Sequence, residues 1–107
     1  MVSGEQDRAA LIEKAKAFAS STAGIAVEVT LARAKAHEKH GENSIEAIAP
    51  KDLRWLSILV EEVGKVSHEL TYDAAGSLRA ELIDVITVAT AWVASLDRID
   101  ATEQVQS

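Results

Sequence analysis

The chain has 107 residues and a net charge of −6, from 17 acidic and 11 basic side chains, and it contains no cysteine. This length suits one domain, and the acidity argues against non-specific binding to nucleic acid or anionic membranes, which needs clustered lysine and arginine. Without cysteine, disulfides and thiolate chemistry are excluded, and without a hydrophobic leader or an apolar run of ~20 residues we expect an intracellular, cytoplasmic protein.

The first half of the chain is predicted to be helical, since an aliphatic, alanine-rich sequence with one proline favours helices over a β-sandwich. Apolar residues recur at helical spacing from about Gln6 to Ser20 and again from about Ile25 to Lys39. Polar residues interrupt the pattern between these segments, so residues 1–24 are expected to form a separate N-terminal arm. Gly41 is predicted to end the second helix, because glycine takes the left-handed conformation without a Cβ penalty.

The second half is predicted to hold two more helices. Residues 41–49 are expected to be a loop, and Pro50 to open a third helix at its first position, where a missing N–H is tolerated. This helix is expected to run to Leu70. A short connection over Thr71–Ser77 then leads to a fourth helix over Leu78–Leu96, with Ser77 as its N-cap.

These elements predict an all-α antiparallel bundle of about four helices. Residues 25–98 are expected to form the helical domain, and residues 99–107 a flexible polar tail. Because a chain of this size buries a thin core on its own, we also expect a homo-oligomer.

The third and fourth helices each carry one apolar stripe that is expected to face the core. On the third helix the stripe comprises Leu53, Leu56, Leu59, Val60, Val63, Val66 and Leu70. On the fourth helix it comprises Leu78, Leu82, Val85, Val88, Ala89, Trp92, Val93 and Leu96.

Three carboxylates beside these stripes form the candidate site. At about 100° per residue, Glu62 lies at the edge of the core and Glu61 faces water. Glu81 and Asp84 lie one turn apart on the flank of the next stripe. A short connection makes the two helices antiparallel, so the three carboxylates can meet across the groove, where Mg²⁺ would neutralise them. Acidic residues at this spacing also describe an ordinary solvated face, and spacing alone leaves both interpretations open.

The sequence around these carboxylates resembles the MazG-like, all-α nucleoside triphosphate pyrophosphohydrolase superfamily, whose signature is EExxE followed, after a variable gap, by ExxD. Glu61-Glu62-Val63-Gly64 begins the first half of this signature, and Glu81-Leu82-Ile83-Asp84 matches the second half in full. The stretch His37–Asn43 is similar to the loop after the family's first helix. The likeness covers about Ile25 to Leu96, and Lys65 stands where the family has its third glutamate.

The resemblance implies a helical bundle that assembles as a dimer or tetramer. It also implies hydrolysis of a nucleoside triphosphate, often a deoxy or damaged one, to the monophosphate and pyrophosphate with Mg²⁺, for which Mn²⁺ can substitute. Carried over by position, Glu62, Glu81 and Asp84 would be the catalytic metal ligands. They would hold a cation that neutralises the triphosphate and activates an attacking water.

Lys65 leaves three interpretations open. In the first, three carboxylates suffice to bind the cation and the activity is weakened. In the second, Lys65 pairs with Glu61 or Glu62 and contacts the substrate phosphate, and the protein binds nucleotide without catalysis. In the third, Lys65 is a surface lysine and the ligand set is completed elsewhere. Glu69 lies about 10.5 Å along the axis from Glu62, too far to complete the same site. The alternative function is therefore a catalytically inactive MazG-like module for nucleotide binding or oligomerisation.

Other side chains are weaker candidates for substrate contact. Trp55 suits base stacking better than Trp92, although the hydrophobic core is the preferred interpretation of both. His37 and His40 fit either a phosphate contact or a cap on the negative end of the helix dipole. Asn43 fits a base or sugar contact, or a turn.

Overall fold

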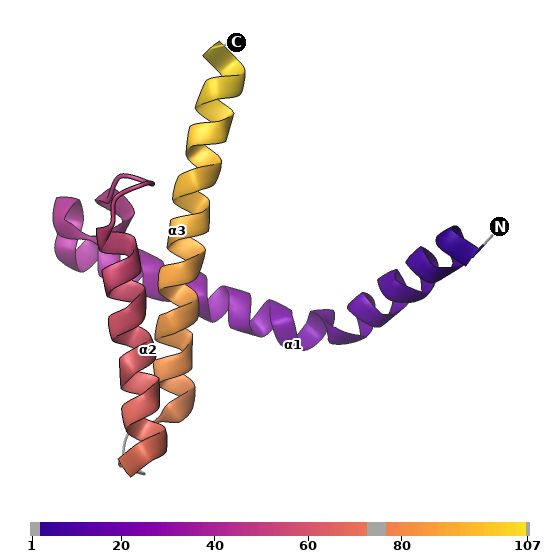
Figure 1. Ribbon diagram of the computed structural model, residues 1–107, viewed down its shortest axis with the longest axis horizontal. Helices are drawn as coiled ribbons and strands as arrows, with labels where there is room; N and C mark the ends of the chain where they lie inside the picture. Colours follow the sequence, from indigo (N-terminus) through magenta and orange to yellow (C-terminus); the bar gives the residue numbers. More distant parts are fainter. Residues whose placement is uncertain (1–2, 73–76, 107) are drawn as a thin grey trace.

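The computed structural model describes residues 3–72 and 77–106, and within these ranges every regular element is helical. The elements are the α-helices α1 (Ser3–His40), α2 (Arg54–Tyr72) and α3 (Leu78–Gln106) and the 3₁₀ turns η1 (Gly41–Asn43) and η2 (Ile45–Ala47). Helices α2 and α3 lie side by side, while α1 crosses them and continues beyond them (Figure 1). The predicted all-α class is confirmed, and none of the described helices is long and apolar enough to cross a membrane.

The first two predicted helices form one continuous helix, so the described part of the chain has three α-helices and not four. The hydroxyls of Ser21 and Thr22, which we expected to interrupt the helix, instead donate to the carbonyl of Phe18 at 2.9 and 3.2 Å. Such bonds to the preceding turn satisfy the hydroxyls and often bend a helix, and α1 is curved in Figure 1. Helix α1 ends at His40, and Gly41 has the predicted left-handed backbone with φ +56°.

Helix α2 begins at Arg54 and not at Pro50 as predicted. The Asp52 carboxylate accepts the backbone N–H of Arg54 at 2.8 Å, so a side chain just before the helix caps its first turn. Pro50 therefore lies in the turn that precedes the helix, where its fixed φ is equally suitable.

Helix α3 starts as predicted, because the Ser77 hydroxyl accepts the backbone N–H of Ala80 at 3.1 Å. The helix does not end near Leu96 but continues to Gln106, through the backbone that we predicted to be a polar tail. The centre of the predicted connection, residues 73–76, lies outside the described residues.

The core is centred on two tryptophans. The rings of Trp55 and Trp92 stack with their centroids 6.0 Å apart and their planes within 3°. Their indole N–H groups donate to the carbonyls of Ala49 and Pro50, at 3.0 and 2.9 Å. Ile48, Val88 and Ala91 complete the buried cluster. The two rings therefore join α2 to α3 and also fix the loop that precedes α2.

The apolar stripe of α2 does not face this core as predicted. Five residues of the predicted stripe are at least half exposed: Leu53, which precedes α2, and Leu56, Val60, Val63 and Leu70. The α2 residues that are not exposed are Trp55, Ile58, Leu59, Glu62, Val66 and Glu69. On α3 the predicted stripe is also partly exposed, at Leu78, Leu82, Val93 and Leu96. The indole ring, and not the more numerous aliphatic side chains, determines which face of α2 turns inward.

An ion pair ties the loop back to α1. The Nη2 atom of Arg33 lies 3.0 Å from Oε2 of Glu46, and both side chains are largely buried. Hydrogen bonding to Arg33 lowers the pKa of Glu46 below its usual 4.5, although burial acts in the opposite direction.

We expect Glu46→Gln to lower the free energy of unfolding by about 1–3 kcal/mol at neutral pH, because a charge-assisted hydrogen bond is lost. A carboxylate with a lowered pKa stabilises the fold above its unfolded-state pKa, and this contribution is lost as the pH falls through the folded-state value. The difference between the two proteins should therefore shrink by ~pH 3. Urea unfolding at a fixed chain concentration measures this, with the exposed Glu42→Gln as control. An equal difference at both pH values would contradict it.

Candidate metal centre

Glu62 on α2 and Glu81 and Asp84 on α3 converge in the structure. One carboxylate oxygen from each residue lies within 4.8 Å of the other two. Glu62 and Glu81 are partly buried, whereas Asp84 is exposed at the edge of the cluster. The periodicity of the two helices predicts this meeting, and the structure brings the three residues together.

The register of the helices explains why these residues meet. The stack of Trp55 on Trp92 places the two positions at one level. Seven residues further along α2, about 10.5 Å, comes Glu62. Because α3 runs antiparallel, the matching position on α3 lies seven residues before Trp92, which is next to Asp84 and one turn from Glu81. The aromatic contact therefore aligns the three carboxylates.

Two carboxylate oxygens of the cluster have no hydrogen-bond donor among the described residues. Within the described part of the chain, Oε2 of Glu62 and Oε2 of Glu81 are buried and have no hydrogen-bond partner. Although the side chain of Asp84 is exposed overall, partial desolvation of its carboxyl group, and then repulsion from Glu81, raises its pKa above the usual 3.8, while Lys65 acts in the opposite direction. Buried acceptors without a donor cost about 1–3 kcal/mol each. A hard divalent cation bound by these oxygens would remove that cost, so the donor set fits Mg²⁺ or Mn²⁺.

Lys65 pairs with one member of the cluster. Its Nζ atom lies 3.3 Å from Oε1 of Glu62, and the side chains of Lys65 and Glu62 are 50% and 16% exposed. The hydrogen bond to Glu62 raises the pKa of Lys65 above its usual 10.5, so the amine is charged at neutral pH. The pairing that one of our interpretations expects is present, but an ion pair with a half-exposed lysine contributes little to stability. It also leaves Oε2 of Glu62 without a donor.

The remaining predicted contact residues lie on other elements or in the core. Trp55 is fully buried against Trp92, so its ring occupies the core. The Nδ1 atom of His37 lies 2.9 Å from the hydroxyl of the buried Ser44. His40 is the last residue of α1, and Asn43, in η1, is exposed beside a hollow that Arg54 and Ile58 also line.

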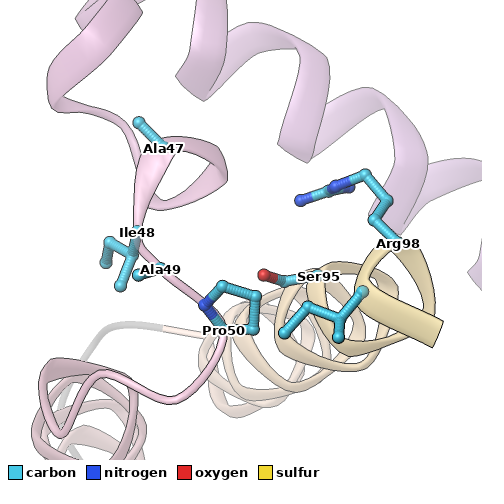
Figure 2. Close-up of a pocket in the computed structure, with 7 residues that line it drawn as sticks. Ala47, Ile48, Ala49, Pro50, Ser95 and Arg98 are labelled. Atoms are coloured by element: carbon cyan, nitrogen blue, oxygen red, sulfur yellow. The ribbon is translucent and has the colours of Figure 1, made fainter. Parts of the chain in front are cut away.

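The sequence did not predict a hollow that lies between the loop before α2 and the second half of α3. Its volume is about 410 Å³, and it is lined by Ala47, Ile48, Ala49, Pro50, Ser95, Arg98 and Ile99. In Figure 2, Ser95 and Arg98 border it from α3, opposite the loop that contains Pro50. Mainly apolar residues with one arginine form no recognisable motif, and no sequence signal marks this place.

Comparison of the chain with protein-family models, curated proteins and solved structures finds no match. The likeness to the MazG-like superfamily therefore stays a prediction. What the carboxylate cluster does has to follow from its own geometry and charge.

We expect Mg²⁺ or Mn²⁺ to raise the unfolding temperature of chelator-treated protein, because a ligand that binds only the folded state stabilises it by about 2.7 kcal/mol at 100 times its Kd. Glu81→Gln should abolish this response, as measured by calorimetry. Glu61→Gln is the matched control, since it makes the same change beside Glu62 but outside the cluster, and it should respond like the wild type. A wild-type unfolding temperature that ignores both cations would contradict the metal site.

Proposed function

We propose that the chain is a Mg²⁺-dependent nucleoside triphosphate pyrophosphohydrolase that converts an NTP or dNTP to the monophosphate and pyrophosphate. The observation that carries the proposal is the convergence of Glu62, Glu81 and Asp84 within 4.8 Å, with two buried oxygens that lack donors. This geometry supports a divalent-cation site. The resemblance of the surrounding motif to the MazG-like family supports the triphosphate substrate and a homo-oligomeric assembly.

In the proposed reaction, water attacks the α-phosphorus and the bond to the bridging oxygen breaks, so that pyrophosphate leaves. When bound, the cation supplies charge neutralisation and a more acidic water. Glu62 and Glu81 would hold it through their Oε2 atoms, which have no hydrogen-bond donor among the described residues. Asp84 is the exposed member of the cluster, so it is the carboxylate that can accept the proton that the water loses. Lys65 forms an ion pair with one oxygen of Glu62, and its positive charge suits a contact with a substrate phosphate.

We expect the purified protein to release pyrophosphate with Mg²⁺ or Mn²⁺ from at least one of the common NTPs and dNTPs. Glu81→Gln should lower the rate by about 10²-fold or more, since even groups that only support metal ligands are worth 10–100-fold. Glu61→Gln should keep the wild-type rate. A pyrophosphate assay across the nucleotide panel measures both, and a folded protein that is silent with every nucleotide would contradict the proposed activity.

The second candidate function is a catalytically inactive MazG-like module that binds nucleotide or oligomerises. The observation that favours it is the contact of Lys65 with Glu62, because an ammonium group occupies one oxygen of a proposed ligand. The added positive charge also weakens the field that attracts a cation.

Lys65→Glu distinguishes the two functions. If the site is otherwise intact, the added carboxylate should increase pyrophosphate release by ~10-fold or more, which corresponds to a barrier lowered by about 1.4 kcal/mol. Lys65→Gln is the matched control, since it removes the charge without supplying a carboxylate. Rates of Lys65→Glu and wild type that are equally low would favour the inactive module.

A further inference from the structure

The single chain exposes far more surface than a compact protein of its size. Its accessible surface is 8104 Å², whereas a compact monomer of 11.4 kDa exposes about 5,800 Å². Its radius of gyration is 17.8 Å, against about 13 Å for a compact domain of this length. The excess, about 2,300 Å² per chain, corresponds for two chains to the area that obligate homodimers bury.

Much of the excess lies in the N-terminal arm, defined here as residues 4–24 of α1. Every residue of the arm is exposed, and the arm extends away from α2 and α3 in Figure 1. Leu11 and Phe18 are each 67% exposed. In proteins most of the stability of a helix comes from packing of its apolar face and not from helix propensity, so the arm needs a packing partner.

The arm continues a face of α1 that already packs. In the second half of α1, Val29 is 3% exposed and Ala32 and Ala36 are partly buried, where α1 contacts α3. Steps of four and three residues back from Val29 lead to Ile25, Thr22, Phe18, Ala15 and Leu11, which share its face. The described residues provide no cover for this face within the arm.

Helix α2, together with the residue just before it, has an uncovered face of similar length, the outward stripe, defined as Leu53, Leu56, Val60, Val63 and Leu70. Within α2 the stripe spans about 21 Å, from Leu56 to Leu70, and the face of α1 from Leu11 to Ile25 also spans about 21 Å. A Cβ added at Gly64, next to Val63, would meet nothing within 4 Å.

We propose that the arm of one chain packs on the outward stripe of a second copy, and that the second copy does the same in return. Two uncovered faces of matching length in one chain satisfy each other in a two-fold dimer. The arm carries three acidic and three basic side chains, Glu5, Asp7, Glu13, Arg8, Lys14 and Lys16, so it offers no patch of one sign to select a charged partner. This dimer does not depend on the chemistry of the carboxylate cluster.

Sedimentation equilibrium of the full chain tests the dimer. The wild type should have twice the mass of one chain, and Leu11→Asp/Phe18→Asp should weaken the dimer by at least about 100-fold, because each change places a charge on a buried apolar anchor. Ala9→Asp/Ala23→Asp is the matched control, since it adds the same charges to the opposite face of the same helix and should leave the mass unchanged. A monomeric wild type, or an arm double variant that associates like the wild type, overturns the proposal.

Cross-linking tests which faces meet, and the absence of native cysteine makes it specific. Chains carrying Phe18→Cys are mixed with longer, tagged chains carrying Val60→Cys and treated with a short bifunctional thiol reagent. The proposal expects a covalent pair of one short and one long chain, and little of it when Ala9→Cys replaces Phe18→Cys. A dimer that forms no such pair, or that links equally through Ala9→Cys, overturns the assignment of the arm to the outward stripe.

Discussion

The stack of Trp55 on Trp92 is the contact on which the rest of the structure depends. It fixes the level of α2 against α3, and through the two indole N–H groups it holds the carbonyls of Ala49 and Pro50. The loop from α1 is thereby seated on the helix pair. Because Glu62 follows Trp55 by two helical turns, the same contact sets the level at which the carboxylates meet.

The same contact also gives the chain an unusual distribution of polarity. Glu62 and Glu81 lie partly buried between helices, while the outward stripe of α2 faces away from the core. Within the described ranges, two buried carboxylate oxygens have no donor, and several aliphatic side chains are uncovered. Our proposals assign a cation to the unpaired oxygens and a second chain to the uncovered side chains. The proposed metal site and the proposed dimer therefore both follow from the orientation of α2 in the structure.

Local sequence was enough to predict the helical class, the glycine that ends α1 and the serine that caps α3, because these depend on near neighbours. Helical periodicity was also enough to predict that Glu62 lies close to Glu81 and Asp84. It did not predict which side of α2 packs against the core, because a periodic pattern shows which residues share a side of a helix but not which element that side contacts. It also failed at Ser21 and Thr22, whose hydroxyls bond within the helix and do not break it. The pairing of Lys65 with Glu62 was foreseen only as one of three alternatives.

The contact between Lys65 and Glu62 has a consequence for how the protein is made. Three carboxylates so close together would push the two helices apart in a newly synthesised chain that has not met an ion. A resident ammonium group, tethered one turn from Glu62 and half in solvent, offsets part of this repulsion from the outset. The helix pair therefore depends less on the proposed cation than three unpaired carboxylates would require.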